Sequence, residues 1–102
     1  MAKKRWSKEE VLALLEQHIP ELKKFTVTKI GLFGSVVRGE NKKKSDIDLL
    51  VELGDETFDN YYDTKVYLEK KFGCNVDLVI IDSIKLRIRD RILGEAAYVT
   101  GF

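Results

Sequence analysis

Three aspartates lie in two short apolar segments that have the composition of β-strands. Asp46 and Asp48 alternate with apolar residues in the run 45–52, and Asp77 interrupts a second run, 75–81. Side chains of a strand alternate between its two faces, so Asp46 and Asp48 are predicted to share one face, about 6.7 Å apart. Aspartate is a poor strand former, and like charges on one face repel each other. A bound divalent cation would remove that conflict.

The third carboxylate joins the other two if the strand that carries Asp77 lies beside the strand that carries Asp48. Neighbouring strands are about 4.8 Å apart, which would bring the three side chains together. Hard oxygen ligands in this number favour Mg²⁺ or Mn²⁺, which keep water and phosphate oxygens as their remaining ligands. Two such ions, about 3.5–4 Å apart, hold the attacking and leaving oxygens of an in-line displacement. The aspartates therefore predict metal-dependent phosphoryl-type transfer.

A Gly-Ser pair ends the strand-like segment that precedes the aspartates. Gly34 and Ser35 follow the β-rich run 26–33 and precede a short helical segment that closes at Gly39. This arrangement permits close backbone approach and offers N–H groups to a phosphate, and the Ser35 hydroxyl adds a donor. Each motif alone is weak, because Gly-Ser pairs are common in turns and two aspartates on a solvent-facing strand need no function. Their order and spacing together favour a phosphate-handling catalytic site.

The elements that must position these residues can be read from caps and periodicity. Ser7 and Glu10 form a capping-box pattern before a first helix, whose apolar residues recur at helical spacing until Pro20. Strands are predicted at about 26–33, 45–52 and 75–81, with a short helix at 35–38 and a long helix at 58–72.

The C-terminal part is predicted to add one more helix after the third strand. Asp82 or Ser83 is placed to cap it, its isoleucines repeat every fourth residue, and Gly94 is predicted to end it. The tail 95–102 fits either a short strand or a partner-facing extension. This order of elements predicts an α/β (α+β) fold, a small mixed β-sheet with helices packed on one side, in one domain of residues 1–102.

The composition is that of an ordinary globular chain, with 44% hydrophobic and 34% charged residues among 102. The formal net charge of +1 provides no global field for nucleic acid, so we expect no strong nucleic-acid binding. Cys74 is the only cysteine, which excludes an internal disulfide and fits a reducing compartment. No stretch approaches the roughly 18 apolar residues of a membrane span. We therefore expect a cytoplasmic protein.

The block from Leu32 to Glu40, with its Gly34-Ser35 pair, and the Asp46-Ile47-Asp48 block after a short loop resemble the signature of the polymerase-beta-like nucleotidyltransferases. They resemble the minimal nucleotidyltransferase (MNT) branch in particular, and the resemblance covers about residues 27–81. It implies that Gly34 and Ser35 bind the triphosphate and that Asp46 and Asp48 are metal ligands. It also implies that Asp77 is the third catalytic carboxylate and metal ligand, which helps to activate the acceptor hydroxyl.

Other polar residues compete with these positions. Asp77 is preferred to Asp82 and Glu52, because its Val-Asp-Leu-Val context matches the family. Arg38 occupies a position that is commonly basic in the branch, which implies a contact with the triphosphate, although a surface arginine before a turn is an equally good explanation. The lysine run 42–44 is left out of the site, because such runs are usually solvated. His18 is expected to be structural.

The resemblance also implies donor, cofactor and partner. Small MNT proteins resemble the antitoxins of helical HEPN ribonucleases, and members of that family adenylylate the toxin on a tyrosine. ATP as donor, Mg²⁺ (two ions) as cofactor and a HEPN toxin hydroxyl as acceptor are therefore expected. The helical acceptor domain of larger relatives does not appear in this sequence, so a partner is expected to complete the site, and homo-oligomers and hetero-oligomers both stay open.

Two other functions compete with protein adenylylation. A non-catalytic binding module could neutralise a partner toxin by direct contact, although retention of all three aspartates argues against it. An enzyme that acts on a small molecule is disfavoured by the length of the chain.

Overall fold

A four-stranded mixed β-sheet forms the centre of the computed structural model, which describes residues 5–41 and 46–102 and therefore not the lysine run 42–44. Its strands are β1 (Val27–Phe33), β2 (Ile47–Leu53), β3 (Val76–Ile80) and β4 (Ala97–Tyr98), in the order β3-β2-β1-β4. β1 is antiparallel to β2 and β4, whereas β2 is parallel to β3. A parallel pair needs a crossover connection, and α4 (Phe58–Phe72) provides it. The predicted small mixed sheet is thus confirmed.

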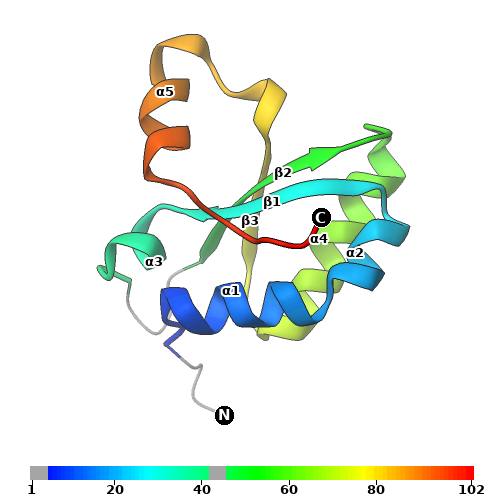
Figure 1. Ribbon diagram of the computed structural model, residues 1–102, viewed down its shortest axis with the longest axis horizontal. Coiled ribbons are helices and arrows are strands. Elements are labelled where there is room, and N and C mark those ends of the chain that lie inside the picture. Colours follow the sequence, from blue (N-terminus) through cyan, green and yellow to red (C-terminus); the bar gives the residue numbers. More distant parts are fainter. Residues whose placement is uncertain (1–4, 42–45) are drawn as a thin grey trace.

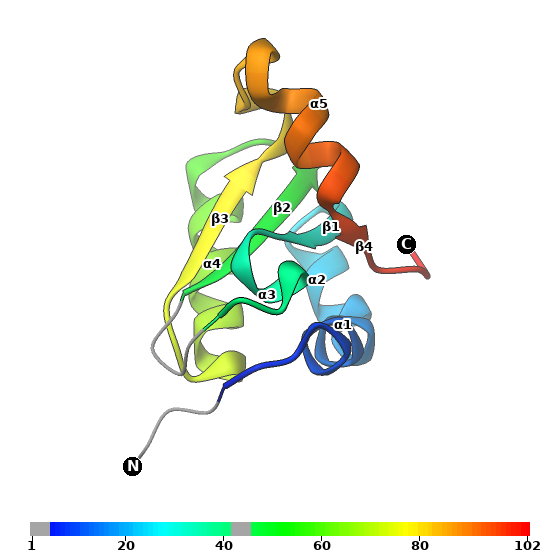
Figure 2. The same cartoon turned by 90° about the vertical axis from the view of Figure 1, so that its left-hand side faces the viewer.

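Three helices cover one face of the sheet and bury the main core against it. They are α1 (Lys8–Gln17), α2 (Ile19–Lys24) and α4 (Figures 1 and 2). The predicted capping box begins α1, where the Ser7 hydroxyl accepts from the Glu10 N–H and the Glu10 carboxylate accepts from the Ser7 N–H, both at 3.1 Å. Alternate residues of β2 point into this core, which includes Leu15, Leu22, Ile47, Leu49, Val51, Leu68 and Leu78.

The opposite face of the sheet is only partly covered. Leu50 is buried there with Ile81 and Ile84, and Ile92 and Leu93 of α5 (Leu86–Glu95) pack against this small cluster. Figure 1 shows α5 on the other side of the sheet from α1 and α2, and no residue of α5 is fully buried. Asp48 lies on this face, next to Gly34, which directly precedes α3 (Ser35–Arg38). None of the helices in the described part of the chain is long and apolar enough to cross a membrane.

The C-terminal elements differ from their predicted limits. β3 is followed by the 3₁₀-helix η1 (Ile81–Ser83), and the Ser83 hydroxyl donates to the Ile80 carbonyl at 2.7 Å. α5 then begins at Leu86 without a side-chain cap, so the predicted cap by Asp82 or Ser83 was wrong. The helix also continues through Gly94 to Glu95, because the following residue, rather than the glycine, takes up the extended conformation.

The tail forms a strand. β4 pairs with β1 through Gly31, opposite Tyr98, and Leu32, opposite Ala97. A Cβ atom on Gly31 would lie 2.6 Å from Cδ1 of Tyr98, so this close packing of the ring on β1 requires glycine. The pairing anchors the chain immediately after α5 and so helps to fix the backbone position of Glu95.

Candidate active site

Asp48 and Asp77 lie side by side in the sheet. The parallel register of β2 and β3 pairs Asp48 with Asp77. Neighbouring partners in a sheet point to the same face, and the residues that flank Asp48 in β2 are buried in the main core. Both carboxylates therefore lie on the opposite, partly covered face, as expected from placing the third strand next to the second.

Asp46 lies just before this strand and not within it, so its predicted place in β2 was wrong. The pairing with β3 begins at Ile47, whose N–H donates to the Asn75 carbonyl at 3.2 Å. Aspartate is a poor strand former, and at Asp46 no ladder compensates for that. The side chain is exposed, yet its charge still acts on Asp48.

The electrostatics of Asp48 connect the parts of the site. Burial raises the pKa of the Asp48 carboxyl, and the negative charges of Asp77 and Asp46 raise it further. A hydrogen bond from the Ser35 backbone N–H and the positive charge of Arg38 act in the opposite direction. The three carboxylates, the Gly-Ser turn and the arginine thus act on one another electrostatically, and Asp48 ionises less readily there than a free aspartate does.

Gly34 is required at the turn for two reasons. Its backbone φ of +78° is in the region that residues with a side chain rarely adopt. A Cβ atom there would overlap Oδ2 of Asp48 and lie 2.9 Å from its Cγ. The Gly-Ser turn and the aspartate strand therefore pack directly against each other.

Replacing Gly34 should reveal this packing. Gly34→Ala is expected to lower the free energy of unfolding by about 2–3 kcal/mol, because it combines a strained φ with displacement of Asp48. Gly34 also has a ψ of −151°, in a region that is essentially restricted to glycine, so part of its loss comes from the backbone alone. Gly39→Ala is the comparison, since Gly39 has a left-handed helical backbone (φ +73°, ψ 18°) and no atom within 4 Å of an added Cβ. It should cost only the roughly 1–2 kcal/mol of the strained φ. Equal losses for both variants in urea titrations would contradict the close approach to Asp48.

Arg38 stands at the end of α3 between two glutamates. Its Nε donates to Glu40 at 2.8 Å and its Nη1 donates to Glu95 at 2.9 Å. The same oxygen of Glu95 accepts the Gly34 N–H at 2.9 Å. Sequence reasoning missed Glu95, because a glycine at position 94 predicts the end of the helix and no motif marks a carboxylate so far along the chain.

The alternative carboxylates lie elsewhere. Glu52 is four residues beyond Asp48 along β2, and its carboxylate accepts from the Thr28 hydroxyl at 2.7 Å. Asp82 lies in η1, after the C-terminal end of β3, and its Oδ1 is 3.8 Å from Nη2 of Arg89. His18 has its Nδ1 2.7 Å from the Tyr67 hydroxyl, next to the helices of the main core. None of the three contributes to the arrangement around Asp48.

The donor set fits Mg²⁺ in the way that this ion is usually bound. Among residues 5–41 and 46–102, no three His, Cys, Asp or Glu side chains form a cluster that could hold a metal by themselves. Mg²⁺ seldom uses such a cage and is commonly held by one or two carboxylates together with water and substrate phosphates. Asp48, with its raised pKa beside two further carboxylates, provides the charge conflict that a cation relieves.

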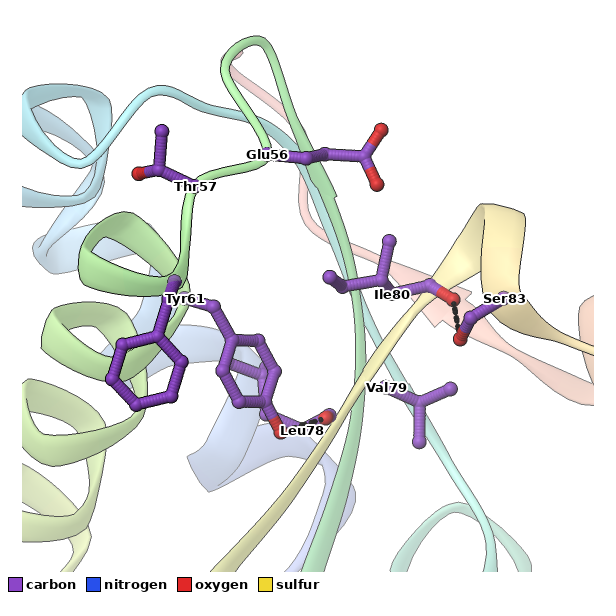
Figure 3. Close-up of a pocket in the computed structure, with 8 residues that line it drawn as sticks. Glu56, Thr57, Tyr61, Leu78, Val79, Ile80 and Ser83 are labelled. Carbon is purple, nitrogen blue, oxygen red and sulfur yellow. Dashed lines mark hydrogen bonds between the residues drawn. The ribbon is translucent and has the colours of Figure 1, made fainter.

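A separate hollow lies at the outer edge of the sheet. It has a volume of about 410 Å³ and is formed by the start of α4 and the end of β3. Figure 3 shows that the Tyr61 side chain reaches the main chain at Leu78, where its hydroxyl donates to the carbonyl at 2.8 Å. None of the three aspartates lines this hollow, so it is distinct from the carboxylate site.

Comparison with known proteins agrees with the geometry. The nucleotidyltransferase domain family matches residues 15–99. Protein adenylyltransferase MntA of Thermococcus cleftensis is 41% identical over 93 residues, which are 89% of this chain and 94% of that protein. A solved "putative minimal nucleotidyltransferase" has a TM-score of 0.79 at 30% identity and covers 92% of this chain and 97% of its own.

A more distant solved structure shares the fold. It is the MNT antitoxin in complex with the tri-AMPylated HEPN toxin of Shewanella oneidensis, with a TM-score of 0.62 at 22% identity over 89% of this chain and 73% of that chain. The family match spans most of the chain and includes both the Gly-Ser turn and the aspartate strands. The chain therefore belongs to the nucleotidyltransferase domain family, and it is an enzyme of that class with the minimal nucleotidyltransferase fold.

Proposed function

We propose that this protein is a Mg²⁺-dependent protein adenylyltransferase that moves AMP from ATP to a hydroxyl group of a HEPN-family toxin and so acts as its antitoxin in the cytoplasm. The observation that carries the proposal is the pairing of Asp48 with Asp77 beside the Gly34-Ser35 turn. The relative named protein adenylyltransferase MntA, 41% identical, supports AMP as the transferred group and a protein as the acceptor.

In this proposal the turn and α3 hold the triphosphate. Gly34 allows phosphate oxygens to approach the backbone, and the Ser35 hydroxyl is a donor for one of them. Arg38 has five N–H donors, and its contacts with Glu40 and Glu95 use only part of them. No other residue of the described ranges 5–41 and 46–102 accepts from Arg38, so its remaining donors can meet phosphate oxygens. Arg38 would then act on the triphosphate through these hydrogen-bond donors, because Glu40 and Glu95 already balance its positive charge.

The three aspartates have different roles in the proposed reaction. Asp46 and Asp48 would hold Mg²⁺, with Asp77 as a further ligand, and the ions when bound neutralise the triphosphate and favour in-line displacement. Asp77 lies beside Asp48 and is exposed, so it is placed to accept the proton of an acceptor hydroxyl. The acceptor oxygen then bonds to the α-phosphorus as the bond to the departing pyrophosphate breaks.

Transfer to a partner tests the proposal directly. We expect the purified protein, with ATP labelled at the α-phosphate, Mg²⁺ and the HEPN-type product of an adjacent reading frame, to add adenylyl mass to that partner. Chelation of divalent ions with EDTA should abolish the transfer, and excess Mg²⁺ should restore it. Intact-mass spectrometry and label incorporation provide the readout. Label that appears on the partner equally well in EDTA, or never appears, would contradict the proposed function.

A further inference from the structure

One carboxylate outside the aspartate cluster touches two parts of the proposed triphosphate site. Oε1 of Glu95 accepts the Gly34 N–H at 2.9 Å and the Arg38 Nη1 at 2.9 Å. The contacts join residues 61 and 57 positions apart in sequence. They connect the end of α5 with the turn that follows β1.

The backbone around Glu95 is fixed on both sides. Ile92, Leu93 and Ala96 pack against the small cluster that contains Leu50. β4 begins at Ala97, opposite Leu32 of β1, only two residues after Glu95. The helix end that carries Glu95 is therefore anchored, and it cannot move as a lid would without loss of this packing and pairing.

The Gly-Ser turn is consequently held between two carboxylates from different elements. Glu95 binds the Gly34 N–H, and Asp48 accepts the N–H of the next residue, Ser35. Arg38 is about half exposed, with 45% of its side chain accessible, so without Glu95 and Glu40 it would sample many rotamers. The two glutamates order its guanidinium before any ligand arrives.

We propose that Glu95 is a positioning residue for nucleotidyl transfer, which fixes the Gly34 backbone and the Arg38 guanidinium in the orientation that receives the triphosphate. The inference rests on the proposed function, because it takes the Gly34-Ser35 turn as the triphosphate site. A hollow of about 250 Å³ adjoins these contacts and is lined by Phe33, Gly34, Arg38, Ile88, Arg91, Ile92 and Glu95. Neither Ser35 nor any of the three aspartates lines it, so it borders the Glu95 contacts and not the carboxylate site.

The Glu95→Ala variant tests this role, with Glu95→Gln as its conservative counterpart. Loss of the support that Glu95 gives to the Gly34 backbone and to Arg38 is expected to weaken MgATP binding about tenfold and to raise KM more than it lowers kcat. Glutamine retains an acceptor oxygen for both donors, so it should recover most of the affinity. Asp90→Ala removes a carboxylate from an exposed position of the same helix and should match the wild type. Affinity is measured by isothermal titration calorimetry.

A second measurement needs no nucleotide. The Gly34 amide should exchange slowly with solvent in the wild type and in Glu95→Gln, and much faster in Glu95→Ala. Tighter MgATP binding by Glu95→Ala would overturn the inference, because Glu95 would then be a competitor of the phosphates. Equal affinities in all variants, or an unprotected wild-type amide, would overturn it as well. Failure of the proposed function is distinct, since it appears as a wild type that binds MgATP and shows the Glu95 effects but transfers nothing.

Discussion

Asp48→Asn is expected to lower the rate of AMP transfer by on the order of 10²–10³-fold without unfolding the protein. Asp48 is the carboxylate at the centre of the site, since it is paired with Asp77 and accepts the Ser35 N–H. Asparagine has a similar shape and keeps an acceptor oxygen, but it loses the charge that a cation requires. Transfer to the partner, measured under single-turnover conditions, should therefore nearly disappear.

The same substitution should leave the free energy of unfolding unchanged or raise it by on the order of 0.5 kcal/mol at neutral pH. The reason is the raised pKa of Asp48, which means that folding disfavours its ionised form. Asp82→Asn, which replaces an exposed aspartate outside the site, is the matched control and should keep full activity. An Asp48→Asn variant as active as its parent would show that the aspartates are ordinary surface residues.

The raised pKa of Asp48 also sets the sign of the pH dependence of the free energy of unfolding. The folded pKa of Asp48 lies above the unfolded value of about 3.9, so the protonated carboxyl favours folding below the unfolded pKa. This contribution is lost as the pH rises through the folded pKa. The stability gained by Asp48→Asn should thus be present above the folded pKa and vanish in acid. Bound Mg²⁺ favours the ionised carboxylate and lowers the pKa of Asp48, so transfer with MgATP should decline only at a pH below the folded pKa of the metal-free protein. Urea titrations and rates across the acidic range measure both effects.

Local signals accounted for much of the fold. The capping box at Ser7 and Glu10, the glycine stop after α4 and the short α3 that closes at Gly39 all occur where caps and glycines predict them. These features depend on neighbours within a few residues, so they are visible in the sequence. The sequence analysis could state the pairing of β2 with β3 only as the condition under which Asp77 lies near Asp48. Strand order depends on contacts between distant segments, which local signals do not reveal.

The aspartate and Gly-Ser motifs could be recognised in the sequence for a different reason. Residues 34, 35, 46, 48 and 77 have types that triphosphate chemistry demands, so their identity and spacing alone favour a function. Their packing was not visible in the sequence. Only the fold shows that Gly34 lies against Asp48, and that the site is built from a turn and a strand in direct contact. The start of β2 after Asp46 likewise depends on where the β3 ladder begins.

The end of α5 and the strand β4 could not be predicted from the sequence. A glycine near the end of a helical pattern commonly stops the helix, but Gly94 lies inside the last turn of α5. That placement makes Glu95 a helical residue directed at Gly34 and Arg38. β4 contains only two residues, too few for a periodicity, and its pairing depends on the space that Gly31 leaves for Tyr98.

Binding of the partner and its modification should be separable. Ser35→Ala and Asp46→Asn are expected to bind the HEPN-type partner as the wild type does but to add at least about tenfold less adenylyl mass to it. Ser35 loses a donor for the triphosphate, and Asp46 loses the charge of a metal ligand. Neither side chain is buried, so folding should be preserved. Ser83→Ala and Asp82→Asn remove the same groups from exposed positions of η1 and serve as matched controls.

Ribonuclease activity of the partner then distinguishes an enzyme from a binding module. With MgATP, the wild type and both controls should suppress that activity by at least about tenfold more than Ser35→Ala or Asp46→Asn at equal complex concentration. Suppression should persist after the antitoxin is removed, because the adenylyl group stays on the acceptor hydroxyl. Size-exclusion chromatography verifies that each variant binds. If suppression is complete without nucleotide, and both site variants protect as well as the wild type, the protein neutralises its partner by contact and its aspartates are not needed for that role.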